Sequence, residues 1–257
     1  STEDNGFLLT PAQLEAAITP RTRWVFINSP CNPSGAVYSE KDFKALGEVL
    51  LSYPDVLVMS DDIYETIVFD NAKFVSFAQA VPELKNRTLT VNGLSKSHAM
   101  TGWRIGYGGG DTELIKAMTK IQGQSTLHPC SITQWAAVEA LNGPQEILQQ
   151  MSDTFAHRRS ATMSRLDAIN GLKCFPPQGA FYLFVSIKDQ LGKTSSSGKL
   201  LSDDVEWVMA LMEEQGVSVV PGSAFGTDGY FRLSFAASGD DLVQACERIK
   251  LFSEGLQ

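Results

Sequence analysis

The chain has 257 residues, 43% of them hydrophobic, which is enough apolar material for one large core or two smaller ones. Its 21 Lys and Arg against 29 Asp and Glu give a net charge of 21 − 29 = −8, without a long run of either sign. This balance argues against a general nucleic-acid binder, which needs a basic face to neutralise phosphates. No apolar run of the sequence approaches the roughly 20 residues that span a bilayer, so we expect no membrane segment.

The cysteines and histidines are scattered along the chain. The four cysteines form no Cys-x-x-Cys pair, which favours single thiols in a reducing compartment over disulfides or zinc ligands. The three histidines are equally far apart, so we expect no metal site. These patterns are typical of a cytoplasmic protein.

The first half of the chain alternates predicted strands with predicted helices. Strands are expected at Trp24–Asn28, Val56–Met59 and Thr88–Val91. Ser39 and Asp42 form a variant of the capping box, and a helix is expected to follow with Phe43, Leu46, Val49 and Leu50 on one face. The alternation indicates an α/β layer with a largely parallel sheet, in which ligands gather beyond the carboxyl ends of the strands.

The pattern changes at Asn142-Gly143-Pro144. Beyond it, a long helix is expected from Gln145 to about Asn170, and a last helix from about Gly239. Between them we predict strands at 181–187, 217–220 and 230–235, and a helix capped by Ser202 with Val205, Val208, Met209 and Met212 on its apolar face. These elements predict a smaller α+β domain over residues 144–257, after a larger domain over residues 1–143.

Lys96 is an unusual lysine, because it directly follows a predicted buried strand and lies between Ser95 and Ser97. An amine shielded from water in such a position can form a Schiff base with an aldehyde. The alternative is a surface lysine whose stem packs along apolar atoms. Eight residues later, Arg104 lies in a glycine-bounded stretch. Its planar guanidinium could bind a phosphate together with the two serine hydroxyls, or it could form an ordinary salt bridge with a carboxylate.

Asp61 and Tyr64 lie three residues apart, so on a helical turn a carboxylate and a phenol would face one ligand. A carboxylate beside a pyridine nitrogen keeps that nitrogen protonated, and a phenol stabilises an anionic ring oxygen. The alternatives are a helix cap for Asp61 and a core aromatic for Tyr64. Asn32 could donate an amide hydrogen bond or form an Asx turn, and Arg232 could clamp a carboxylate or solubilise an edge strand.

These residues occur in a fixed order: Asn-Pro-Ser-Gly, Asp-x-x-Tyr, Ser-Lys, an arginine, and Arg-Leu-Ser. Together with the stretches NSPCNPSGAVYS, SDDIYE, VNGLSKSHAMTGWRIGY, PQGAFYLF and VVPGSAFG, they resemble the class I/II aminotransferases, most closely the aspartate aminotransferase-like branch. The resemblance extends over essentially the whole chain. It implies the α/β fold of the fold type I transferases that depend on pyridoxal 5′-phosphate (PLP), with part of the large mainly parallel-sheet domain and a smaller α+β domain.

The resemblance also implies roles for the residues above. Lys96 would carry PLP as an internal aldimine and move the proton of the substrate. Asp61 would pair with the pyridine nitrogen, Asn32 and Tyr64 with the ring oxygen, and Arg104 with the phosphate, helped by Ser95 or Ser97. Arg232, and Asn32 beside the ring, would bind the substrate. The expected reaction moves an amino group from an amino acid such as aspartate to 2-oxoglutarate, in a homodimer.

The family's amino-terminal arm, its phosphate turn, the aromatic that stacks on the ring and the residues that select the amino donor all precede Asn32. We therefore expect this chain to be a fragment that lacks the N-terminal part. Two other functions use nearly the same residues. One is another fold type I PLP enzyme, such as a β-lyase or decarboxylase; the other is a non-catalytic truncated or regulatory domain. Arg232 favours the transaminase, because transamination needs the substrate carboxylate held while the Cα–H bond breaks.

Overall fold

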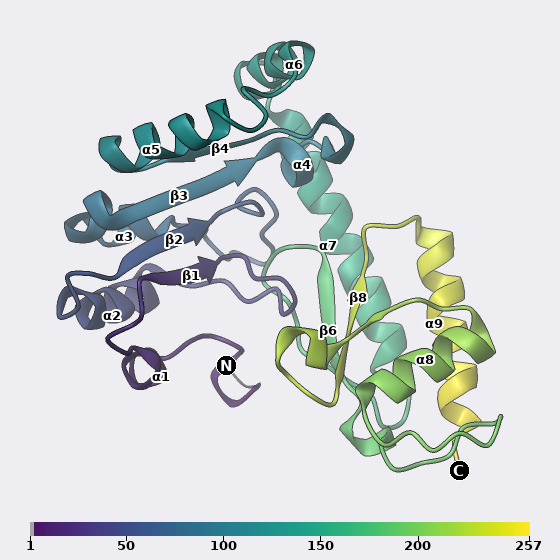
Figure 1. Cartoon of the computed structure of the whole chain (residues 1–257). Coiled ribbons are helices and arrows are strands. Elements are labelled where there is room, and N and C mark those ends of the chain that lie inside the picture. Colours follow the sequence, from purple (N-terminus) through teal and green to yellow (C-terminus); the bar gives the residue numbers. More distant parts are fainter. Residues whose placement is uncertain (1–2) are drawn as a thin grey trace. The chain divides into compact units, whose positions relative to one another are not determined.

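The computed structural model describes residues 3–257, which form two compact units (Figure 1). The first unit comprises residues 3–31 and 36–152. The second comprises residues 153–257 together with the short loop Asn32–Gly35. The division into domains at residues 143 and 144 stays a prediction.

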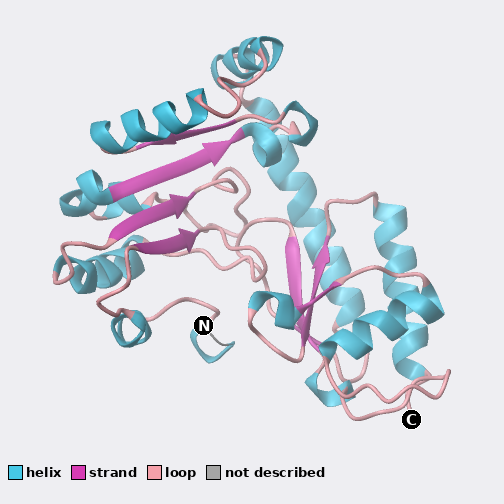
Figure 2. Cartoon of the chain, in the orientation of Figure 1, coloured by secondary structure: helices cyan, strands magenta, loops and turns pink. Residues whose placement is uncertain are grey.

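The first unit is built on a four-stranded sheet in the order β1-β2-β3-β4 (Figure 2). Strands β1 (Trp24–Asn28), β2 (Leu57–Asp61) and β3 (Thr88–Gly93) are parallel, whereas β4 (Gly106–Gly109) runs antiparallel to β3. The predicted strands are therefore confirmed, although β2 begins one residue and ends two residues later than expected. The mainly parallel sheet is the predicted α/β layer.

Helix α2 (Glu40–Leu51) begins where the capping box predicts. The Ser39 hydroxyl accepts from the Asp42 amide, and the Asp42 carboxylate accepts from the Ser39 amide. The apolar face of α2 packs on the sheet, in a core that includes Ile27 and Val58. The remaining helices of this unit are η1 (Glu3–Asn5), α1 (Pro11–Ala17), α3 (Phe77–Ala80), η2 (Pro82–Arg87), α4 (Leu94–Ser97), η3 (Thr101–Trp103), α5 (Thr112–Gly123) and α6 (Ser131–Asn142).

The second unit is an α+β structure around an antiparallel sheet in the order β5-β6-β8-β7. Its strands are β5 (Lys173–Cys174), β6 (Tyr182–Ser186), β7 (Val220–Pro221) and β8 (Tyr230–Ser234). Its helices are α8 (Asp204–Gln215), α9 (Gly239–Glu254), η4 (Lys188–Gln190) and η5 (Gly222–Phe225), and the long α7 (Glu146–Leu166) leads into it from the first unit. The strand expected at 217–220 is wrong for most of its length.

The predicted cap of α8 is also wrong, and so are three of the four residues predicted for its apolar face. The N-cap is Asp203, whose carboxylate accepts from the Glu206 amide, rather than Ser202. The buried side chains include Trp207, Val208 and Leu211, whereas Val205, Met209 and Met212 are exposed. The reason is that Trp207 stacks on Phe231 at 5.1 Å between ring centroids and meets Phe252 edge-on, so the tryptophan sets which side of the helix turns inward.

Among the described residues, no helix is both long enough and apolar enough to cross a membrane.

Candidate active site

The carboxyl ends of β1, β2 and β3 lie side by side at one edge of the first unit's sheet. The register pairs Asn28 with Asp61 and Asp61 with Val91, so the segments that follow these residues start from neighbouring points. The Asn28 side-chain amide donates to the Asp61 carbonyl at 2.9 Å, which ties the first two strand ends together. Asp61, Tyr64 and Lys96 all belong to the segments that start at this edge.

Asp61 is the last residue of β2 and is half-buried. Its carboxylate accepts a hydrogen bond from the Ile63 amide at 3.2 Å, and the residue does not cap a helix. Burial raises the pKa of Asp61, because the ionised carboxylate loses water, and the Ile63 amide offsets only part of this effect. A cation beside Asp61 would therefore be favoured.

Tyr64 is 4% exposed and follows Asp61 in a single turn, closed by the Glu65 amide donating to the Asp62 carbonyl at 2.9 Å. This turn replaces the helical turn that the three-residue spacing suggested. The burial of Tyr64 agrees equally with a core aromatic and with a phenol at a ligand, so its role stays a prediction.

Lys96 lies in the short helix α4, directly after β3, and is half-buried. The chain leaves β3 at Gly93 and returns to β4 at Gly106, its partner in the register, so the 94–105 loop starts and ends at one point. A Cβ on Gly93 would lie 3.0 Å from the Ile105 carbonyl oxygen, and glycine therefore permits this close return. The loop places both Lys96 and Arg104 near the sheet edge that is formed by the carboxyl ends of β1, β2 and β3.

Arg104 has a left-handed backbone (φ 53°) and is exposed, with one guanidinium nitrogen donating to the Thr101 carbonyl at 2.9 Å. The two candidate phosphate serines differ. Ser95 is half-buried, whereas Ser97 is buried and its hydroxyl lies 2.8 Å from Nδ1 of His98. The Ser97 hydroxyl therefore already has a hydrogen-bond partner, and the choice between the two serines as phosphate ligands stays a prediction. No sequence pattern predicted the contact between His98 and Ser97.

In the second unit, the guanidinium of Arg232 donates to the side-chain oxygen of Asn32 at 2.8 Å. The same guanidinium lies over the rings of Tyr182, at 4.5 Å, and Phe225, at 5.0 Å. Arg232 belongs to β8, an interior strand of its sheet, so the alternative of an edge-strand solubilising residue is wrong. The two rings and the Asn32 amide hold the planar guanidinium of Arg232 in a defined orientation.

The loop Asn32–Gly35 is fixed to a turn of the same unit. The amides of Gln178 and Gly179 both donate to the Gly35 carbonyl at 2.9 Å, and Arg159 of α7 donates to the Pro177 carbonyl at 3.0 Å. Gly35 has φ +69°, and a Cβ there would lie 2.2 Å from Cβ of Pro177. This glycine is therefore required for the approach that positions Asn32.

Sequence reasoning missed a buried acid beside Asp61. Asp62 is 2% exposed, and its carboxylate accepts from the Ser60 hydroxyl at 2.6 Å. Burial raises the pKa of Asp62 to about 6, against the opposing effect of hydrogen bonds from the side chains of Ser60 and Ser76. Strand alternation could have found it, because Ser60 and Asp62 follow Val58 on the core side.

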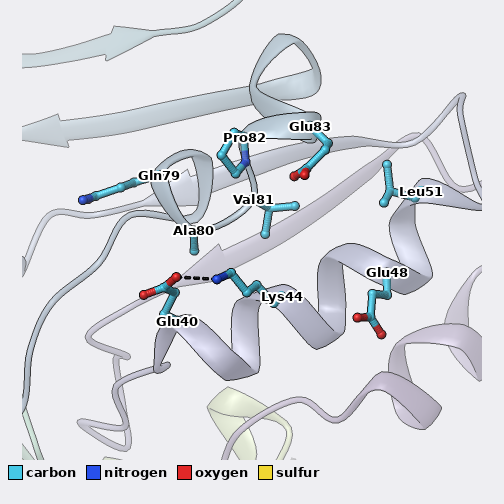
Figure 3. Close-up of a pocket in the computed structure, with 9 residues that line it drawn as sticks. All are labelled: Glu40, Lys44, Glu48, Leu51, Gln79, Ala80, Val81, Pro82 and Glu83. Carbon is cyan, nitrogen blue, oxygen red and sulfur yellow. Dashed lines mark hydrogen bonds and ion pairs between the residues drawn. The ribbon is translucent and has the colours of Figure 1, made fainter.

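A hollow of about 460 Å³ lies elsewhere in the first unit, between α2 and the segment Gln79–Glu83 (Figure 3). It is lined by carboxylates and by Lys44, which is paired with Glu40. None of the predicted site residues lines it, and it is separate from the site described above.

Comparison with known proteins identifies the family. The model of the family described as aminotransferase class I and II matches residues 1–249. The chain belongs to this family. The match agrees with the ordered motifs and confirms the predicted resemblance.

Individual aminotransferases match the chain closely. It is 55% identical over 245 residues to an aspartate aminotransferase of Rhizobium meliloti and 52% identical over 253 residues to an aspartate/prephenate aminotransferase of Cereibacter sphaeroides. These matches cover 95% and 98% of this chain but 60% and 63% of the relatives. The chain thus spans less than two thirds of their length, as expected for a fragment.

Solved aminotransferase structures share the fold. The crystal structure of the aspartate aminotransferase from Rhizobium meliloti superposes with a TM-score of 0.97 at 52% identity, covering 100% of this chain and 64% of that one. An aromatic aminotransferase from Pyrococcus horikoshii gives 0.89 at 34% identity, covering 98% and 65%. The predicted fold type is confirmed.

Proposed function

We propose that the protein carrying this chain is a PLP-dependent transaminase, in which Lys96 forms the covalent bond to the cofactor. The observation that carries the proposal is the convergence of Asp61, Tyr64 and Lys96 on one sheet edge, with Arg104 on the loop that closes there. Carboxyl ends of parallel strands are where ligands of α/β proteins bind. Each side chain supplies a different group that such a cofactor needs.

The chemistry of these residues fits PLP. The amine of Lys96 suits the aldehyde, and the guanidinium of Arg104 with the hydroxyl of Ser95 or Ser97 suits the phosphate. Burial disfavours the ionised carboxylate of Asp61, so a protonated pyridine nitrogen beside it would restore the charge stabilisation that water no longer supplies. When bound, PLP supplies an electron-withdrawing ring that stabilises negative charge at the substrate Cα.

The remaining roles belong to side chains of this chain. Once the substrate amine has displaced Lys96 from the cofactor, the free lysine amine would take the proton from the substrate Cα and pass it to C4′ of the cofactor. Tyr64 and Asn32 would donate to the ring oxygen. Arg232 would bind the substrate α-carboxylate through its fork, and its contacts with Tyr182 and Asn32 support that role because they orient the guanidinium.

The substrates and assembly are proposed from the relatives. Aspartate or a similar amino acid is the proposed donor, because the matched relatives are named aspartate and aspartate/prephenate aminotransferases. We propose 2-oxoglutarate as acceptor, a homodimer as the assembly and the cytoplasm as the location.

Borohydride trapping of PLP tests the assignment. The PLP-loaded protein is expected to show a Schiff-base absorption band that borohydride bleaches. Borohydride reduction should leave PLP covalently attached to the peptide that contains Lys96, as a label for mass spectrometry. Lys96→Ala should abolish the band and the label, whereas Lys116→Ala, at an exposed lysine of α5, should change neither. A wild-type protein without the band would refute the role of Lys96.

A panel of amino donors with 2-oxoglutarate then separates the reaction types. Formation of glutamate from aspartate is expected. Pyruvate and ammonia released from cysteine-like donors, without glutamate, would favour a β-lyase and leave the Lys96 assignment intact.

A further inference from the structure

Asp204 is a buried acid that has no part in the reaction proposed above. It lies in the first turn of α8, is 1% exposed, and directly follows the exposed Asp203. Aspartates are rarely buried to this degree, and an acid in the first turn of a helix interacts with the helix dipole while it stays in water. Capping does not explain the burial of Asp204 either, because Asp203 already accepts from the Glu206 amide as the N-cap of α8.

The Asp204 carboxylate is bonded to a distant turn of the second unit. It accepts a hydrogen bond from the Ser223 amide at 2.6 Å, across 19 positions of the sequence. Ser223 belongs to η5, and further backbone bonds close this turn: the Thr227 amide donates to the Gly222 carbonyl at 3.1 Å, and the Gly226 amide to the Ser223 carbonyl at 2.9 Å. Hydrogen bonds from backbone amides to carboxylates are among the strong ones in proteins. Asp204 therefore anchors η5 to the start of α8.

The same turn carries an aromatic ring to Arg232. Turn η5 directly follows β7, in which Val220 is the register partner of Arg232 on β8. The ring of Phe225, at the end of η5, lies 5.0 Å from the guanidinium carbon of Arg232. Phe184 of β6 meets the Phe225 ring edge-on, at 6.4 Å between ring centroids. A ring beside a guanidinium attracts the cation and limits the orientations that it can take.

The two rings that contact Arg232 are held in different ways. Tyr182 belongs to β6, and the ladder of hydrogen bonds between β6 and β8 fixes its place beside Arg232. Phe225 instead lies in a four-residue turn that follows the strand pairing of β7 with β8. The position of the Phe225 ring therefore depends on what anchors the turn, and the Asp204 carboxylate is such an anchor.

We propose that Asp204 is a positioning residue for Arg232. Its carboxylate holds η5 in place, so that the Phe225 ring keeps the guanidinium oriented toward the carboxylate of the substrate amino acid. The inference rests on the proposed function, in which Arg232 binds that carboxylate. Burial of a carboxylate costs free energy unless hydrogen bonds compensate for the lost water, and the positioning of Arg232 gives a reason for this cost.

Steady-state kinetics of the PLP-loaded protein that carries this chain test the role of Asp204. Asp204→Ala removes the acceptor of the Ser223 amide, and it should raise the KM for aspartate about fivefold or more while kcat changes less than about twofold, because carboxylate binding is weakened equally before and during the reaction. Asp204→Asn keeps an acceptor and should hold KM within about twofold of the unsubstituted protein. Asp203→Ala is the matched control: it removes the neighbouring carboxylate and the cap of α8 but leaves η5 anchored, so KM should stay unchanged.

A double-mutant cycle shows whether Asp204 acts through Arg232. In an Arg232→Lys background, Asp204→Ala should raise KM less than about twofold, because the planar guanidinium that the Phe225 ring orients is already absent. Phe225→Leu should raise KM in the unsubstituted background and should likewise lose its effect beside Arg232→Lys. Circular dichroism verifies the folding of each variant, and Phe225→Leu and Asp204→Asn decide even if Asp204→Ala does not fold.

Four results would overturn the inference. They are an unchanged KM in Asp204→Ala, an equal rise of KM in Asp203→Ala, a rise in Asp204→Ala that persists beside Arg232→Lys, and an unchanged KM in Phe225→Leu. A large rise of KM in Asp204→Asn would also count against it, since the acceptor is retained. All these results leave the borohydride-sensitive band at Lys96 in place, whereas loss of that band from the unsubstituted protein would refute the proposed function itself.

Discussion

Arg232 donates a hydrogen bond to Asn32 at 2.8 Å, although 200 positions separate the two residues in the sequence. The same guanidinium lies over the rings of Tyr182 and Phe225. The Arg-Leu-Ser and Asn-Pro-Ser-Gly motifs therefore form a single structural feature, in which one amide side chain and two aromatic rings orient the guanidinium of Arg232.

Arg232→Lys should impair the reaction without disturbing the cofactor. Lysine keeps the charge but cannot make the paired hydrogen bonds of the fork, so the KM for the amino acid should rise about ten- to a hundredfold. The absorption spectrum of bound PLP should stay unchanged. Steady-state kinetics of the protein that carries this chain measure the effect. Arg248→Lys, at an arginine bonded to the Gln215 carbonyl, is the control, and an unchanged KM in Arg232→Lys would contradict the role.

Gly35→Ala should destabilise the second unit and displace Asn32. Gly35 and Gly226 have similar backbones, with φ +69° and +72°, but a Cβ would strike Pro177 only at Gly35 and would meet open space at Gly226. Gly226→Ala should cost about 1–2 kcal/mol for the left-handed backbone alone, and Gly35→Ala should cost clearly more. Urea unfolding measures both. Equal losses would mean that the loop yields without strain.

Trp207→Ala tests the corrected face of α8. Trp207 is fully buried, stacks on Phe231 and donates to the Gln190 side chain at 2.9 Å, so its truncation should cost about 3–5 kcal/mol of unfolding free energy. Met212→Ala, on the predicted face that proved to be 53% exposed, should cost less than about 1 kcal/mol. If Met212→Ala were the more damaging change in urea unfolding, the inward face of α8 would be the predicted one.

Asp62→Asn should stabilise the protein at neutral pH. Because burial raises the pKa of Asp62 from 3.8 to about 6, the ionised form is disfavoured in the folded state. The resulting loss of unfolding free energy is absent below the pKa that Asp62 has in the unfolded chain. It grows as the pH rises toward about 6 and is then constant, at about 3 kcal/mol or less. Asparagine can still accept from Ser60 and carries no charge. Urea unfolding at about pH 4 and about pH 8 should show the gain at the higher pH alone; a pH-independent difference would contradict the buried charge.

Local patterns predicted much of the fold. The strand at Trp24–Asn28 has the expected bounds, and the helix after Ser39 begins at its capping box, because both depend on residues that are neighbours in the sequence. The pattern failed on α8, where two apolar faces compete and the choice depends on distant Phe231 and Phe252. It also missed His98 beside Ser97, since a hydrogen bond between adjacent side chains has no periodic signal.

The sequence alone determined the family, because the ordered motifs around Asn32, Asp61, Lys96 and Arg232 need only residue types and spacing. It also determined the α/β and α+β classes, which follow from periodicity. The tertiary structure decided which motifs meet. Strand register unites the ends of β2 and β3, and the return of β4 to Gly93 adds Arg104. Long-range packing joins Asn32 to Arg232, since contacts between distant segments depend on the whole fold rather than on local propensity.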